Sequence, residues 1–363
     1  MSDVTMVTTP DDGSCGIGNY TGDLLRAMPE ALDANEVYVE LGSLDPFEFL
    51  RAAFEAGLSD APTVHVQHEY GIFGPKSLMS WLFFPILFVL ATLRDKRIVV
   101  TFHSAWNSDT VGAPLRPLKR AYVALNNRMV AAIADEAVFL SENCKEKFLE
   151  SAPLESVTVL PHGVPTETKP MDEADAKAEF GYDPDETVIV EPGYVRPEKG
   201  CDLFVDLARR LEDYSFLLAG GSQGADEYFE EIRREIPENV QMTGVLSDRR
   251  FHAAFIAADL VVLPYREVTQ SGIFNWCAAY ERPVVGSDEP YFERLSDNWD
   301  AVEVVDFNDI DRAASIVRTI VESDERSREL KERVGKYRSD RSFEGVVEKQ
   351  LDIYQRADTS SGG

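Results

Sequence analysis

Short apolar, β-branched runs alternate with stretches of helical periodicity along most of this 363-residue chain, and this alternation constrains the fold most strongly. Six such runs come first, at residues 4–8, 37–41, 63–66, 98–102, 137–140 and 157–160. Six more follow, at residues 188–190, 215–219, 240–243, 260–263, 283–285 and 302–305. Short apolar runs between helices are typical of strands buried in parallel sheets. The sequence therefore predicts an α/β protein with two similar parallel-sheet domains.

The segment at residues 165–184 is rich in proline and charge and separates the two series. We therefore predict an N-terminal domain over residues 1–165 and a C-terminal domain over residues 166–340. Helical patterns close the chain, the last of them over residues 343–356. The tail at residues 358–363 is expected to be disordered.

The charge balance is strongly acidic, with 64 Asp and Glu against 36 Lys and Arg and a net charge of −28. Such a surface repels nucleic acid, so we expect no nucleic-acid partner. An acidic surface that is poor in lysine also suits a salt-rich cytoplasm, where repulsion is screened. The four cysteines show no metal-binding or disulfide spacing, and the polar N-terminus lacks a signal-peptide pattern. We expect a cytoplasmic protein without a metal.

One uncharged run, SLMSWLFFPILFVLATL at residues 77–93, is interrupted by Pro85. It is too short for a clean transmembrane helix, so a helix packed in the core or on the domain surface is predicted. Trp81, Phe83 and Phe84 precede a basic cluster, however, and this order also suits an interfacial helix. A peripheral contact with the inner face of the cell membrane through residues 77–97 therefore remains the alternative.

The stretch TVIVEPGYVRPEKG, at residues 187–200, carries the strongest functional signal. Arg196 and Lys199 lie between the end of a predicted strand and the start of a helix, where α/β sheets bind ligands. Two cations beside the positive end of a helix dipole repel each other unless an anion such as a diphosphate lies between them. The alternative is an ordinary solvated loop.

A glycine-containing loop, DDGSCGIGNYTGDLL, follows the first predicted strand and opens a helix. Gly16 and Gly18 allow a ligand to approach the backbone closely. Thr21 stands where a dinucleotide fingerprint would have its third glycine, and no P-loop motif is present. Nicotinamide binding and P-loop phosphotransfer are therefore not supported.

Six motifs occur in the order and spacing of a GT-B glycosyltransferase of family 4, which the chain resembles over nearly its whole length. They are CGIGNYT, HVQHEYGIFG, TFHSA, PHGV, GYVRPEKG and LPYREVTQSG. The resemblance implies two facing Rossmann-like domains, with a helix at residues 341–357 that packs back on the N-terminal domain. It also implies a retaining transferase without a bound metal or other cofactor. The C-terminal domain would hold the nucleotide-sugar donor, and the N-terminal domain would hold the acceptor.

The resemblance also assigns roles to individual residues. Arg196 and Lys199 match diphosphate-binding positions, and His103 matches a histidine near the transferred sugar. This agrees with the chemistry, because an enzyme without a metal needs fixed cations and amides to stabilise a departing diphosphate. The remaining candidates are, on the donor side, Gly16, Gly18, Glu198, Glu267, Gln270, Ser271 and Gly272, and, on the acceptor side, Tyr20, Glu69 and Tyr70.

One departure from the family pattern concerns the donor ribose. The family commonly carries two glutamates in an E-x7-E spacing, the second of which binds the ribose. If Glu267 matches the first, the second position is Asn275, with Trp276 beside it. Asn275 is therefore a donor-binding candidate without the carboxylate.

The sequence thus predicts a retaining glycosyltransferase that moves a sugar from a nucleotide-diphosphate donor to a glycan, lipid-linked or small-molecule acceptor. A non-catalytic sugar-nucleotide-binding partner of a heteromeric transferase is the first alternative, because the ribose carboxylate is missing. A sugar-nucleotide epimerase is the second alternative.

Overall fold

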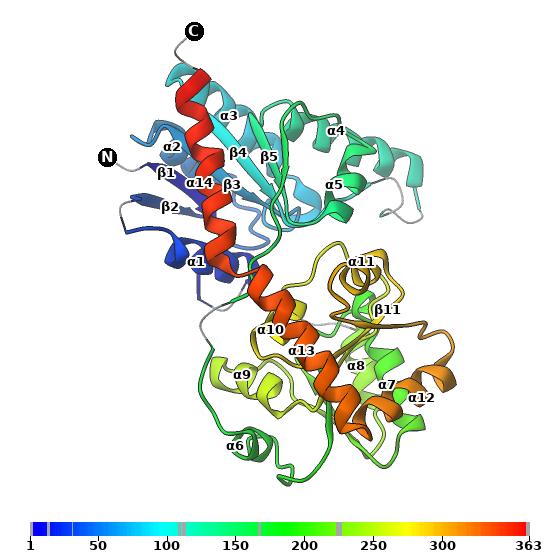
Figure 1. The fold of residues 1–363 in the computed structure, drawn as a ribbon. Helices are drawn as coiled ribbons and strands as arrows, with labels where there is room; N and C mark the ends of the chain where they lie inside the picture. Colours follow the sequence, from blue (N-terminus) through cyan, green and yellow to red (C-terminus); the bar gives the residue numbers. More distant parts are fainter. Residues whose placement is uncertain are drawn as a thin grey trace. The chain divides into compact units, whose positions relative to one another are not determined.

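The computed structural model of the protein describes residues 3–12, 15–30, 32–107, 110, 114–165, 168–222 and 227–360. The chain forms two compact units, each with its own sheet (Figure 1). The first unit contains the chain up to Gly163 and the segment from Phe343, and the second unit contains Val164–Ser342. The predicted domain boundaries, after residues 165 and 340, fall close to these positions.

The first unit holds a parallel sheet of six strands in the order β2-β1-β3-β4-β5-β6. Its strands are β1 (Val4–Thr8), β2 (Ala34–Tyr38), β3 (Thr63–His68), β4 (Arg97–Phe102), β5 (Glu136–Phe139) and β6 (Val157–Val159). Its helices are α1 (Gly16–Ala27), α2 (Pro46–Leu58), α3 (Ser80–Leu93), α4 (Arg116–Ala131), α5 (Glu142–Leu149) and α14 (Phe343–Ser360), with a 3-10 turn η1 (Pro75–Ser77).

Successive side chains of these strands point into two different cores, because successive side chains of a strand lie on opposite faces of the sheet. Val7 and Phe139 belong to the core that includes residues of α2, α3 and α5, whereas Met6 and Val138 belong to the core that includes residues of α1 and α14. Ile353 of α14 is fully buried in the second of these cores. The C-terminal helix therefore completes the first unit, as predicted.

Two predicted boundaries need correction. The strand expected at residues 37–41 lies at residues 34–38, because its pairing with β1 runs from Ala34 to Tyr38. The tail expected to be disordered from residue 358 is helical as far as Ser360. Once a helix is anchored by packing, each added residue extends it at little further cost. Residues 361–363 lie outside the described part of the chain.

The second unit repeats the architecture, with six parallel strands in the order β12-β11-β10-β7-β8-β9. Its strands are β7 (Val188–Pro192), β8 (Ser215–Ala219), β9 (Val240–Met242), β10 (Leu260–Leu263), β11 (Val284–Ser287) and β12 (Glu303–Val305). Its helices are α6 (Glu173–Ala178), α7 (Cys201–Arg210), α8 (Glu227–Glu235), α9 (Asp248–Ala257), α10 (Gly272–Ala279), α11 (Pro290–Trp299), α12 (Ile310–Val321) and α13 (Asp324–Asp340), with a 3-10 turn η2 (Pro197–Lys199).

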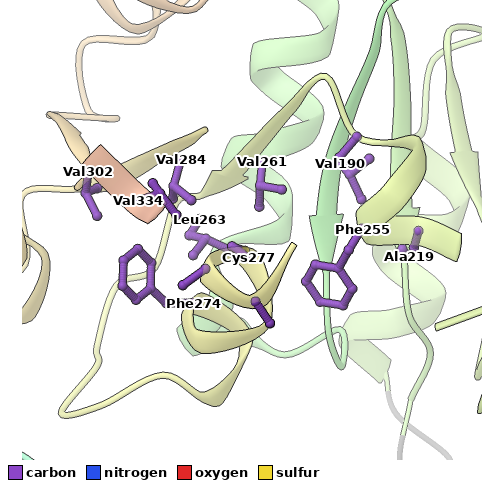
Figure 2. Packing of buried hydrophobic residues seen from close by; sticks show 14 of the residues in the cluster. Val190, Ala219, Phe255, Val261, Leu263, Phe274, Cys277, Val284, Val302 and Val334 are labelled. Atoms are coloured by element: carbon purple, nitrogen blue, oxygen red, sulfur yellow. The ribbon is translucent and has the colours of Figure 1, made fainter. Parts of the chain in front are cut away.

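The core on one face of this sheet holds α10 in place. Val261 and Leu263 of β10 cluster with Phe274 and Cys277 of α10 and with Val334 of α13 (Figure 2). These apolar side chains are fully buried. Because α10 is fixed on its apolar side, its N-terminus has a defined place at the carboxyl end of β10. Both units therefore have the Rossmann-like parallel sheet that was predicted from the sequence.

The uncharged run at residues 77–93 becomes η1 and α3. Phe83, Phe84 and Leu87 are fully buried against the sheet of the first unit, so the core interpretation is confirmed for these side chains. The suggestion that Phe83 and Phe84 contact lipid is therefore wrong, because both side chains point into the protein. No helix in the described ranges combines the length and apolar character needed to cross a bilayer.

Candidate active site

The loop after β7 carries the two predicted phosphate-binding cations. Arg196 directly precedes η2, and α7 begins at Cys201. The Arg196 guanidinium is exposed, and its Nη1 lies 3.6 Å from Oε1 of Glu198. Arg196 therefore lies beyond the carboxyl end of a central strand, where parallel sheets bind their ligands.

Lys199 lies deeper in the same loop. Its Nζ is 3.7 Å from the centre of the Tyr265 ring. Burial lowers the pKa of Lys199 to about 8, although Glu198 and Glu191 partly oppose the shift. An anion beside Lys199 would favour the charged form and raise this pKa again. The geometry thus suits a lysine whose positive charge is strengthened by a bound phosphate.

Glycines allow the loops after β7, β8 and β10 to pack backbone against backbone. Gly200 has a φ of +71°, and a Cβ placed on it would lie 2.0 Å from the carbonyl oxygen of Pro264. A Cβ on Gly220 would lie 1.6 Å from the carbonyl oxygen of Gly193. No side chain fits at either contact, so both positions must be glycine for the three loops to pack this closely.

The first turn of α10 faces this group of loops. A Cβ on Gly193 would lie 3.5 Å from the Ile273 side chain, so the β7 loop adjoins the start of α10. Ser271 caps the helix, and its hydroxyl accepts a hydrogen bond from the Phe274 amide at 3.2 Å. Gln270 precedes this cap and Gly272 follows it. First-turn amides lack partners within their own helix and attract anions.

An ion pair that sequence reasoning missed ties the two loops together. Arg266 donates to both carboxylate oxygens of Asp202, at 2.6 and 2.5 Å, and its backbone amide donates to the Glu198 carbonyl at 2.9 Å. The Glu267 amide lies 3.5 Å from the same carbonyl oxygen. The structure therefore brings together the two donor-side glutamates, Glu198 and Glu267. The sequence signal was an Arg shortly after the predicted strand at residues 260–263 and an Asp in the first turn of the helix that follows residue 200.

Glu191, which sequence reasoning also missed, is a carboxyl group inside the β7 strand. It is 3% exposed, and its Oε1 accepts a hydrogen bond from Sγ of Cys201 at 3.3 Å. Burial raises the pKa of Glu191 to about 8, although Lys199 slightly lowers it. The only sequence signal was a lone carboxylate at the end of a strongly apolar run.

The structure does not support Asn275 as a ribose-binding residue. Asn275 is 1% exposed, and its Oδ1 accepts a hydrogen bond from the Tyr337 hydroxyl at 3.1 Å. The next residue, Trp276, points elsewhere and packs edge-on against His252, with ring centres 5.0 Å apart. Successive helical residues are rotated by about 100°, so the two side chains meet α13 and α9 respectively. The prediction that Asn275 binds the donor is therefore wrong, because its side-chain amide is buried and hydrogen-bonded within the core of the second unit.

In the first unit, His103 follows β4 and is surrounded by polar and aromatic groups. Its Nε2 lies 2.8 Å from Oε1 of Gln67 on β3, which fixes the ring and places the proton on Nε2. The Tyr20 ring packs edge-on at 4.9 Å. Burial, with a smaller effect of His162, lowers the pKa of His103 well below its usual value. His103 is therefore a neutral hydrogen-bonding group. Gln67 was not predicted from the sequence.

The acceptor-side candidates differ in exposure. Tyr20 and Tyr70 are 2% and 1% exposed, so they support neighbouring groups from the interior. The Tyr70 ring stacks on Trp106 at 4.2 Å, and its hydroxyl donates to Asn127 at 2.7 Å. Glu69 is less buried and accepts hydrogen bonds from the Gly71 amide and the Ser104 hydroxyl. Glu69 thus lies beside the segment that carries His103.

The two glycines of the N-terminal loop have different surroundings. A Cβ on Gly18 would lie 2.0 Å from the Pro10 carbonyl oxygen, so α1 needs glycine there to approach β1. A Cβ on Gly16 would meet no atom within 4 Å. Gly16 is exposed at the first position of α1.

The described residues include no group of three His, Cys, Asp or Glu side chains placed to hold a metal ion. All four cysteines are buried free thiols.

Comparison with known proteins finds one family match in each half of the chain. Residues 172–337 match the model "Glycosyl transferases group 1", and residues 73–168 match "Glycosyltransferase Family 4". The D-inositol 3-phosphate glycosyltransferase of Mycobacterium sp. (strain JLS) is 28% identical over 264 residues, which are 66% of this chain and 57% of that protein. The alpha-galactosylglucosyldiacylglycerol synthase of Streptococcus pneumoniae is 26% identical over 47% of each chain. The chain thus spans about half the length of these relatives.

Solved structures share the whole fold. Sucrose-phosphate synthase from Thermosynechococcus elongatus superposes with a TM-score of 0.76 at 16% identity, over 99% of this chain and 100% of that one. Anabaena Alr3699/HepE in complex with UDP-glucose gives 0.77 at 11% identity, over 97% and 99% of the two chains. At these low sequence identities, the structural similarity shows that the fold is shared and nothing more. The chain thus has the GT-B fold, and its two units contain segments similar to the glycosyltransferase family 4 and group 1 models.

Proposed function

We propose that the protein is a retaining glycosyltransferase that uses a nucleotide-diphosphate sugar. The observation that carries the proposal is the convergence, in the second unit, of the Lys199 and Arg196 loop with the N-terminus of α10. Gly193 adjoins Ile273, and Lys199 lies against Tyr265 in the loop that leads to α10. The cations of the loop after β7 and the first-turn amides of α10 can then bind one anion from two sides.

In the reaction, the bond between the anomeric carbon of the sugar and the diphosphate oxygen breaks, and negative charge develops on the diphosphate. Arg196, Lys199 and the amides of Gly272 and Ile273 stabilise that charge, without a metal. In the first unit, Gln67 holds the neutral ring of His103, and the family resemblance assigns this histidine to the transferred sugar. The oxygen of an acceptor hydroxyl forms the new bond to the anomeric carbon on the face that the diphosphate leaves, and the hydroxyl proton passes to the departing diphosphate oxygen, so the anomeric configuration is retained.

The first donor to test is a uridine diphosphate sugar, because the structurally similar Anabaena protein has been solved with UDP and with UDP-glucose. For the acceptor, the named relatives act on inositol phosphate and diacylglycerol compounds. We therefore propose a hydroxyl group of a small phosphorylated polyol or of a glycolipid, and the acceptor assay compares these two classes.

The test combines binding with turnover. Melting temperatures are measured with UDP, GDP, ADP and their sugars, since a ligand at about 100 Kd adds roughly 2.7 kcal/mol to the stability. The nucleotide sugar that stabilises the protein is then incubated with and without acceptor, and release of the nucleoside diphosphate is followed. Transfer to an acceptor supports the proposal. Binding without turnover supports the non-catalytic partner, and a sugar isomer formed without acceptor supports the epimerase.

A further inference from the structure

The solvent-facing side of α3 and α4 is unusual for this protein. Six exposed aliphatic or aromatic side chains, hereafter the α3–α4 face, lie on these helices and just before α3: Leu78, Phe88, Val89, Leu93, Leu118 and Leu125. Their exposed fractions range from 44% for Phe88 to 76% for Leu93. Both helices pack on the same side of the sheet, because each follows a strand in the right-handed sense from β3 to β4 to β5.

The two helices are direct neighbours. The Tyr122 hydroxyl of α4 donates to the Lys76 carbonyl, just before α3, at 2.9 Å. The rings of Tyr122 and Trp81 are 6.3 Å apart. Leu118 and Leu125 flank Tyr122 at helical spacing, so their side of α4 continues the exposed side of α3.

The charge of this region is opposite to that of the whole chain. α3 contains no charged residue, and α4 contains no acidic one. Residues 71–134 carry eight Lys and Arg against two Asp and Glu, within a chain of 36 Lys and Arg and 64 Asp and Glu. Lys76 and Arg94 lie at the two ends of α3. Apolar side chains surrounded by cations are typical of surfaces that bind anionic lipid.

We propose that the α3–α4 face docks the protein on an anionic bilayer, with Phe88 and Val89 in the interfacial region and Lys76 and Arg94 at the head groups. A second copy of the chain fits less well, because a symmetric pair would bring two basic surfaces together. One exposed carboxylate, Asp95, directly follows Arg94 at the end of α3. The sequence suggested a membrane contact through residues 77–97 that used Phe83 and Phe84. Those two side chains are buried, and the α3–α4 face instead presents the outer side of the same segment together with α4.

The proposal does not rest on glycosyl transfer, so its test needs no substrate. The full chain is sedimented with vesicles of phosphatidylcholine alone and with vesicles that contain about 30% phosphatidylglycerol, at about 0.1 M salt. The expected result is binding to the anionic vesicles. The variants Phe88→Ser/Val89→Ser and Lys76→Gln/Arg94→Gln are each expected to lower the partition coefficient about tenfold or more.

The matched control is Val245→Ser, which removes an exposed apolar side chain, 67% exposed, from the second unit. It should bind as the wild type does. Melting temperatures of all variants should stay near that of the wild type, because the replaced side chains are exposed. Equal binding of the wild type and both face variants would overturn the proposal. So would a dimer in solution that Phe88→Ser/Val89→Ser dissociates, if the wild type ignores the vesicles.

Discussion

At the scale of single residues, the donor-side cations are the most direct test of the chemistry. Arg196→Ala and Lys199→Ala should each lower kcat/KM by about 10²-fold or more, the effect of losing one preorganised charge in the transition state. Steady-state kinetics on the identified donor checks this. Arg318→Ala is the control, because Arg318 pairs with Asp213 at 3.7 Å on the surface, away from the loop. Near-normal turnover in both loop variants would contradict the assigned roles.

Asn275 offers a test of where the first turns of α10 point. Asn275→Glu should lower the melting temperature, because it places a carboxylate beside the buried Tyr337 hydroxyl and disrupts a hydrogen bond. The affinity for the nucleotide, measured by calorimetry, should stay the same. Glu281→Gln, which alters an exposed carboxylate, is the control for stability. Tighter nucleotide binding by Asn275→Glu would return this residue to the donor site.

Glu191 should make stability depend on pH. Its folded-state pKa of about 8 is above the ordinary value of 4.5, so its contribution is fully present below pH 4.5 and is lost as the pH rises through 8. Glu191→Gln removes this dependence. The melting temperature of the variant relative to the wild type should therefore rise steadily between pH 5 and pH 8. The lowered pKa of Lys199 makes stability depend on pH only between about pH 8 and pH 10.5, which is outside this window. A constant difference across the range would show that Glu191 is ionised in the folded protein.

At the scale of elements, α3 combines a core side with a solvent side in an entirely uncharged helix. Phe83→Ala should cost about 3–5 kcal/mol, because it leaves a cavity in the core of the first unit. Phe88→Ala, five residues along the same helix, should change the stability by less than about 0.5 kcal/mol, because Phe88 is exposed. Urea unfolding of the two variants measures both values. Similar losses would mean that the helix is rotated from its position in the structure.

At the scale of the whole molecule, the net charge of −28 sets the response to salt. Repulsion between surface carboxylates opposes the compact state, and salt screens it. The melting temperature should therefore rise between about 0.05 and 2 M KCl, mostly at the lower concentrations where the screening length changes most. The uncharged osmolyte sucrose, which stabilises proteins without screening charge, separates the two effects. A flat response to KCl would show that the ion pairs of the surface already balance the repulsion.

The sequence by itself determined the parts of this protein that depend on local periodicity. Apolar runs marked the strands of both sheets, and the Pro-Gly break after β7 placed Arg196 and Lys199 at a carboxyl edge, because strand ends and turns are encoded by neighbouring residues. The interior position of Phe83 and Phe84 also agreed with the favoured prediction. Only the tertiary structure decided that Asn275 bonds to Tyr337, that Gln67 orients His103, that Glu191 is buried, and that the outer sides of α3 and α4 form one surface. Each of these depends on which strands and helices become neighbours, and contacts between residues far apart in the chain leave no trace in local periodicity.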